Sequence, residues 1–158
     1  MWNALAGLVM AAGLSLAPGA AREPTKEDSA AIEQCVVDAK NDPYACLGLV
    51  EKPCQDTEAG QTTYGAMLCA DRETVVWSQR AKASADAITA KLEPARLKLF
   101  KAADDAWVKY RNAACAYESS IYLGGSLAKV VAADCMLRET ADRALDLADD
   151  EKSSVNGE

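Results

Sequence analysis

The sequence predicts an all-α protein, a small disulfide-stapled bundle of about five helices in which the last two form an antiparallel hairpin. Three observations predict this fold. Alanine is the prevailing apolar residue and there is only one Phe among 158 residues, which suits closely packed helices. Apolar residues recur at helical spacings of three and four, without an alternating strand pattern. Six cysteines, an even number, are typical of an exported chain with disulfides.

Residues 1–21 resemble a cleavable signal peptide. They contain no charged side chain, and their apolar run, 4–17, is too short to span a bilayer comfortably. Pro18 and Gly19 end the run, and small residues lead to a cleavage site after Ala21. Because no Lys or Arg precedes the run, an uncleaved membrane anchor is the alternative interpretation.

The expected domain organisation follows from this N-terminus. A signal peptide at 1–21 precedes a helical domain at 22–149, and a flexible polar tail follows at 150–158. The protein is then periplasmic or secreted, without stable membrane insertion after cleavage.

Two short helices are expected first. Thr25 is a suitable N-cap for a first helix with an acidic first turn, and this helix carries Cys35 and stops at 41–43. A short second helix ends at Pro53, and 54–60 is a loop.

Two long helices follow, separated by the helix breaker Pro94. Thr62 or Thr63 caps the third helix, and the fourth runs from Pro94 to about Tyr122. The fourth has the most regular apolar spacing in the chain. The predicted stripe of the third helix is Met67, Ala70, Trp77, Ala81, Ala85, Ile88 and Leu92, and that of the fourth is Phe100, Ala103, Trp107, Tyr110, Ala114, Tyr117 and Ile121.

A turn and a fifth helix complete the bundle. Gly124 and Gly125 end the fourth helix, because glycine readily takes a left-handed conformation, and Ser126 caps the fifth. The apolar face of the fifth helix comprises Leu127, Val130, Leu137, Ala141, Ala144 and Ala148. We expect the three long helices to pack side by side.

The cysteines predict three disulfides, with reduced thiols in a cytosolic protein as the alternative. Their pairing is open, because six cysteines allow 15 connectivities. One pair is favoured: Cys115 and Cys135 lie at nearly equal distances before and after the glycine turn, so they face each other across the hairpin. Nearest-neighbour pairing would link Cys35 with Cys46, Cys54 with Cys69, and Cys115 with Cys135.

The hairpin carries the candidate site residues. Trp107, Arg111 and Cys115 share one helix face at i, i+4 and i+8, with Tyr110 beside them. They are either core and ion-pair residues or part of a recognition surface near the turn. The segment 124–126 either forms a turn with a helix cap or is an exposed binding loop.

Composition argues against several classes of function. A net charge of −7 repels nucleic acid and anionic lipids. The absence of histidine removes the commonest general base and zinc ligand. Acidic pairs such as Asp104-Asp105, and Asp134 with Glu139, are expected to be solvated surface, and no calcium-loop pattern occurs. We therefore predict no catalytic residue, no metal and no cofactor.

The chain from about residue 30 to 148 resembles the LprI-type lysozyme inhibitor family. The motif positions are Trp107, Tyr110, Arg111, Cys115, Gly124, Gly125, Ser126, Cys135, Thr140, Arg143 and Leu147. Upstream, Cys35, the run Cys46-Leu47-Gly48, Cys54, the run Thr63-Tyr64-Gly65, Cys69, Glu73 and Trp77 are similar to the N-terminal part of exported members. The chain departs from the family at Ser78, Ala81 and Lys82, where the family usually has Asp, Leu and Asn, and at Asn112, where the family commonly has Asp.

The resemblance implies a helical, exported, disulfide-containing binding protein, not an enzyme. Its expected partner is a protein, a basic lysozyme-type enzyme, whose encounter with an acidic chain is accelerated by charge. The alternatives are an envelope interaction module with another partner, and a hydrolase with two converging carboxylates in a cleft.

Overall fold

The computed structural model describes residues 23–39 and 42–156, and within these ranges the chain forms helices and turns only. The predicted signal peptide, 1–21, lies outside the described residues. The elements are α1 (Lys26–Asp38), the 3₁₀ helix η1 (Pro43–Cys46), α2 (Glu51–Gln55), α3 (Thr63–Thr89), α4 (Pro94–Ser120) and α5 (Ser126–Asn156). The all-α class predicted from the sequence is confirmed.

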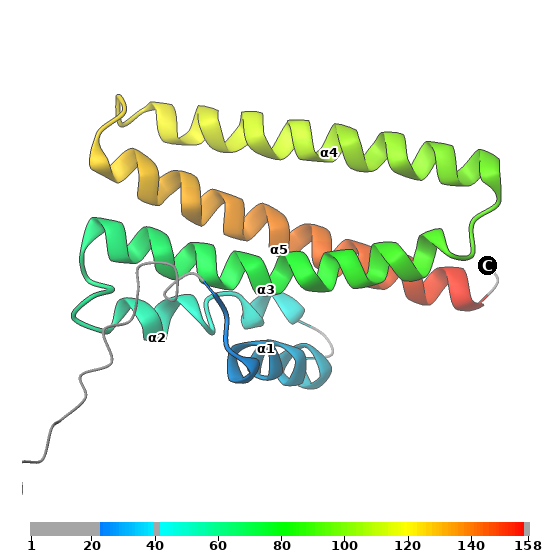
Figure 1. The fold of residues 1–158 in the computed structure, drawn as a ribbon, viewed down its shortest axis with the longest axis horizontal. Helices are drawn as coiled ribbons and strands as arrows, with labels where there is room; N and C mark the ends of the chain where they lie inside the picture. Colours follow the sequence, from blue (N-terminus) through cyan, green and yellow to red (C-terminus); the bar gives the residue numbers. More distant parts are fainter. Residues whose placement is uncertain (1–22, 40–41, 157–158) are drawn as a thin grey trace, which may run out of the picture.

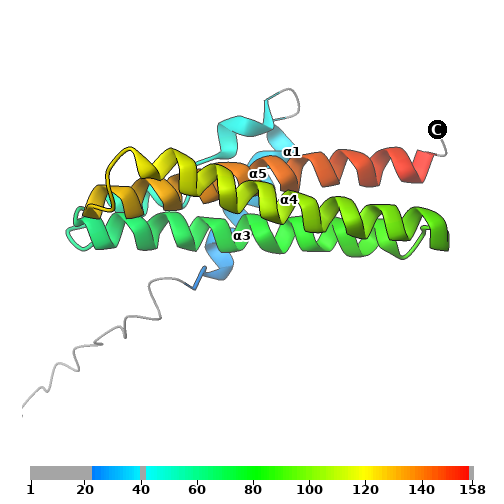
Figure 2. The same ribbon diagram turned by 90° about the horizontal axis from the view of Figure 1, so that it is seen from above.

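Helix α5 is the central element of the bundle. It packs along α3 over the most extensive helix contact, and α4 packs against α5 from another side (Figures 1 and 2). Helix α2 lies against the N-terminal part of α3, whereas α1 and η1 lie against the middle of α3 and the C-terminal half of α5. The core between α1, α3 and α5 is formed by Ile32, Cys46, Val50, Ala70, Val76, Trp77, Ala133, Leu137, Ala141, Ala144 and Leu145.

The six cysteines form three disulfides in the nearest-neighbour pattern. Cys35 is joined to Cys46, Cys54 to Cys69, and Cys115 to Cys135. The first ties α1 to η1, the second ties α2 to α3, and the third ties α4 to α5. On the chain-entropy model, a loop of such length contributes about 3 kcal/mol to stability.

The N-terminal caps form as their sequences predict. The Thr25 hydroxyl accepts the Asp28 N–H while the Asp28 carboxylate accepts the Thr25 N–H, which is a capping box. Thr62 caps α3 by accepting the Gly65 N–H at 2.9 Å. A Cβ at Gly65 would lie 1.8 Å from the carbonyl oxygen of Ala59, so the close approach of this loop to α3 requires glycine.

The prediction that Pro53 ends a helix is wrong. Pro53 lies in the first turn of α2, which continues to Gln55. An N–H in that turn has no intrahelical acceptor, so proline is tolerated there. The predicted loop therefore begins after Gln55 and not at Cys54.

Helix α4 differs most from its prediction. Phe100, Trp107 and Ala114 are partly buried, but Tyr110, Tyr117 and the other predicted stripe positions are exposed. Only Cys115 of this helix is fully buried. The reason is that, within the described ranges, α4 packs extensively only on α5, so one narrow side of a broad apolar surface is covered.

Helix α5 is buried on two sides, as its central place requires. Leu137, Ala141 and Ala144 are buried, whereas Leu127 at its start is half exposed. The helix begins at Ser126 and continues to Asn156. Ser126 is thus its first helical residue and not its cap, and the helix extends past Asp149, where the sequence predicted a flexible tail. No helix in the described ranges is both long and apolar enough to cross a bilayer.

Candidate functional site

Four of the predicted site residues meet in one cluster between α4 and α5. The guanidinium of Arg111 lies 4.8 Å and that of Arg143 5.6 Å from the ring centre of Trp107. Arg111 also donates to the Thr140 hydroxyl at 3.2 Å, and that hydroxyl donates to the carbonyl of Met136 at 2.6 Å. Contacts of a guanidinium with an aromatic face stabilise such pairs most when they are partly desolvated.

The cluster is completed by a carboxylate that sequence reasoning placed in solvent. Asp104 pairs with Arg143 at 3.1 Å, so it bridges α4 to α5. Burial lowers the pKa of Arg111, and the nearby charge of Glu139 partly opposes that change. Because Arg111 and Arg143 are both engaged with neighbouring side chains, this cluster, which we call the Trp107 cluster, fixes α4 on α5.

The connection between α4 and α5 and the first turn of α5 expose four large apolar residues, Ile121, Tyr122, Leu123 and Leu127. Leu123 is 94% exposed and Ile121 is 70% exposed. Leu123 and Gly124 both have left-handed backbones, with φ of 52° and 75°, and this reverses the chain within a few residues. We call residues 121–127 the hairpin tip. It lies at the end of the molecule opposite the C-terminus (Figure 1).

The hairpin tip carries no charge and has a fixed backbone. Residues 119–128 contain no Asp, Glu, Lys or Arg. Successive backbone hydrogen bonds, from Tyr122 to Ser119, from Leu123 to Ser120 and from Gly125 to Tyr122, hold the turn. A Cβ at Gly124 would meet nothing within 4 Å, so this glycine is required by its backbone angle and not by crowding.

The remaining predicted site residues are not brought into the Trp107 cluster. Tyr110 is 60% exposed, on the side of α4 that faces away from α5. Gly124, Gly125 and Ser126 belong to the hairpin tip. The motif therefore comprises one interhelical cluster, one turn and one exposed tyrosine, and these are three separate features.

Glu73 is a buried carboxylate for which the residue pattern alone predicted no structural role. Its side chain accepts the N–H groups of Gly48, Val50 and Glu51, each at 2.8 Å, and the indole N–H of Trp77 at 3.0 Å. Gly48 presents its N–H from a left-handed backbone with φ of 89°. The signal was present in the sequence, because Glu73 stands between Ala70 and Trp77 on the apolar stripe of α3.

A second carboxylate pair joins α2 to α5. Glu51 and Asp134 are partly buried and lie close enough for their charges to interact. Burial, together with the charges of Asp134 and Glu73, raises the pKa of Glu51 to about 7. Asp134 was expected to be solvated surface, so that expectation is wrong. Neither residue lines the two grooves described below.

This pair predicts that stability falls as pH rises. The folded-state pKa of Glu51, about 7, is above the ordinary value of 4.5 for a glutamate side chain, so the folded protein holds the extra proton between these pH values and stability is lost as pH rises through that window. Replacing Glu51 with glutamine should remove this dependence. After a discount for the exposed part of the side chain, we expect the free energy of unfolding of the variant to rise by about 1 kcal/mol relative to that of the wild type between pH 5 and pH 8.

Urea denaturation of both proteins at several pH values tests this prediction. An unchanged stability difference across pH 5 to pH 8 would show that Glu51 does not hold a proton in the folded state. The exposed Glu58 supplies a matched control, since its replacement by glutamine should leave the pH profile of the wild type unaltered.

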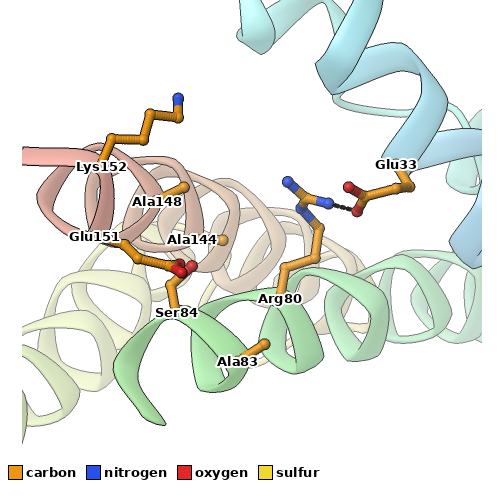
Figure 3. A pocket seen from close by; sticks show the side chains of 8 residues that line it. All are labelled: Glu33, Arg80, Ala83, Ser84, Ala144, Ala148, Glu151 and Lys152. Carbon is orange, nitrogen blue, oxygen red and sulfur yellow. Dashed lines mark ion pairs between the residues drawn. The ribbon is translucent and has the colours of Figure 1, made fainter. Parts of the chain in front are cut away.

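Two adjoining grooves lie between α1, α3 and the C-terminal half of α5, with volumes of about 510 and 660 Å³. Alanines form the floor of the first, and Arg80 at its edge is ion-paired with Glu33 (Figure 3). Lys152 at the other side pairs with Asp149 at 3.0 Å. These cations are already neutralised by carboxylates, and no group of metal-binding side chains occurs in the described parts of the chain.

Comparison with known proteins gives one match. The model of the family described as Lysozyme inhibitor LprI matches residues 54–147, a segment that contains the second and third disulfides, Glu73, the Trp107 cluster and the hairpin tip. No curated protein and no solved structure matches the chain.

Proposed function

The chain belongs to the LprI lysozyme inhibitor family, and from this membership we propose that it is an exported, non-enzymatic protein that binds and inhibits a lysozyme-type cell-wall lytic enzyme. The predicted signal peptide and the three disulfides support a periplasmic or secreted location, because disulfides persist in oxidising compartments.

The observation that carries the proposal is the exposed hairpin tip. Inhibitors of enzymes with open clefts need a protruding element that fills the cleft without a large loss of conformational freedom on binding. Leu123 and Ile121 project apolar side chains from a turn whose ends are anchored by two long helices. We propose that this tip enters the substrate cleft of the lytic enzyme.

Charge supports a basic partner whose cleft contains carboxylates. The chain has a net charge of −7, which accelerates encounter with a basic enzyme. The tip itself is uncharged across 119–128, so it meets catalytic carboxylates without like-charge repulsion. The acidic surface as a whole thus steers the encounter, and the uncharged hairpin tip enters the cleft.

The covalent and aromatic contacts behind the tip provide rigidity. Cys115 and Cys135 are linked about two turns from it, and the Trp107 cluster follows further along the same helix pair. A preorganised tip loses less entropy on binding, and this is how rigid inhibitors achieve high affinity.

Replacing Leu123 with aspartate should weaken inhibition at least about tenfold, as expected for a central interface residue. Aspartate tolerates the left-handed backbone at this position better than most residues, so folding should be preserved. The measurement is the inhibition constant in a turbidity assay of cell-wall lysis with an animal c-type lysozyme.

The matched control is Val37→Asp, which places the same charge at an exposed apolar residue of α1. We expect this control to inhibit like the wild type. Equal inhibition by the Leu123 variant would exclude the tip as the binding element, and no inhibition by wild-type protein at micromolar concentration and low salt would exclude this enzyme as the target.

A second candidate function is an envelope interaction module with a different partner. The specific observation in its favour is the exposed apolar side of α4, where Leu99 and Tyr117 are 71% and 80% exposed. A pull-down from envelope extract that recovers another protein, together with failure of the lysis assay, would favour this alternative.

A further inference from the structure

The outward side of α4 has a regular pattern that neither the fold nor the hairpin tip uses. Six residues, at successive spacings of four, three, four, three and four, form what we call the α4 outer face. All are exposed: Leu99, Ala103, Ala106, Tyr110, Ala113 and Tyr117. A 3.5-residue period is the pattern by which two helices pack side by side, and within the described chain α4 packs extensively only against α5.

We propose that the α4 outer face pairs with the same face of a second copy of this chain, with the two helices antiparallel. A two-fold interface requires that when one residue contacts another, the reverse contact also forms. If Tyr110 of one copy lies opposite Ala113 of the other, the antiparallel register places Tyr117 opposite Ala106, because both pairs of numbers have the same sum. Each tyrosine then covers an alanine, in both directions.

Size complementarity is the first argument for this occupant. Large and small side chains that face each other interdigitate and fill the space between helices. The four tyrosines of the dimer are matched with four alanines in one register, and the short alanine side chains let the helices approach closely.

Charge distribution favours the antiparallel arrangement. Lys98 and Lys101 lie in the N-terminal half of α4, whereas residues 112–120 contain only one charged residue, Glu118. In the register above these lysines lie level with residues 125 and 122 of the other copy, just beyond the C-terminal end of its α4, where the helix dipole is negative. A parallel pair would instead place like lysines together.

The available area indicates a reversible dimer. Helix α4 has 27 residues, so it is about 40 Å long and about 10 Å wide. In the register above only residues 103–120 of the two copies overlap, a length of about 27 Å, so the pair has a footprint of roughly 500 Å² in total, smaller than a standard specific interface. Because each copy carries a net charge of −7, repulsion opposes pairing, and added salt should strengthen the dimer.

Sedimentation equilibrium of the purified protein tests the proposal. We expect the wild type to be monomeric near about 1 µM and to approach twice the monomer mass near about 1 mM, as a weak interface requires. Tyr110→Glu and Ala113→Arg should each remain monomeric, because each places charges against an apolar partner residue. A mixture of the two variants should form a heterodimer, since the carboxylate introduced at Tyr110 of one copy then faces the guanidinium introduced at Ala113 of the other.

The control is Asn112→Glu, which adds one negative charge to α4 outside the α4 outer face and should dimerise like the wild type. Circular dichroism should show equal helicity and melting for all variants, because the changed residues are exposed. A wild type that stays monomeric at every concentration overturns the proposal. So does a dimer that survives both substitutions, and so does the absence of a heterodimer in the mixture.

Discussion

Replacing Glu73 with alanine is expected to lower the free energy of unfolding by about 4 kcal/mol or more, a large part of the stability of a small domain. The side chain is fully buried and accepts four hydrogen bonds, three from backbone N–H groups before and within α2 and one from Trp77. Each buried donor left without an acceptor costs about 1–3 kcal/mol.

Urea denaturation followed by tryptophan fluorescence measures this loss. Glu73→Gln should lie between the wild type and the alanine variant, because an amide keeps one accepting oxygen and presents donors on its other side. The exposed Glu58 is the matched control, and its replacement by alanine should cost well under 1 kcal/mol, as for most surface positions. A loss below about 1 kcal/mol for Glu73→Ala would show that other acceptors replace the carboxylate.

Removal of the Cys115–Cys135 disulfide by a double alanine substitution is expected to have the second largest effect. A loop of this length contributes about 3 kcal/mol, and α4 has no other covalent tie within the described chain. We expect α4 to open from α5 more readily than α3 does, and inhibition of the lytic enzyme to fall, because the hairpin tip loses its support.

The double substitution of Cys54 and Cys69 provides a matched comparison, since it removes a disulfide of similar loop length that ties α2 to α3. This variant should lose similar stability, but at a temperature where it stays folded it should inhibit like the wild type. Inhibition that survives loss of the Cys115–Cys135 disulfide, or that falls equally in both variants, would contradict a specific role of this disulfide in supporting the hairpin tip.

The helices could be predicted from the sequence because their signals are local. Thr25 and Thr62 cap helices by hydrogen bonds to residues three positions away, and apolar spacing follows from helix geometry alone. The place of Cys135 opposite Cys115 also follows from counting residues on either side of a turn.

Which side of a helix is buried could not be predicted in the same way. The stripe of α4 is more regular than that of α3, yet Tyr110 and Tyr117 are exposed, because burial depends on how many helices pack around each element. Helix α5 took the central position, with contacts on two sides, and this left α4 with one extensive helix contact in the described part of the chain.

The polar contacts depend on pairs that are distant in the sequence. Glu51 and Asp134 meet although 83 residues separate them, and Asp104 reaches Arg143 across the hairpin. Nothing local distinguishes these carboxylates from those of a solvated helix surface. For Glu73 a local signal did exist, because a charged residue on an apolar stripe requires buried partners.

Hydrogen exchange of the protein, measured by mass spectrometry with and without an animal c-type lysozyme, tests the central claim most directly. The proposed mode of binding predicts that amides of residues 121–127 exchange more slowly in the complex, while those of α1 and of the C-terminal half of α3 do not change. Protection confined to any other surface, with the hairpin tip unaffected, would contradict it.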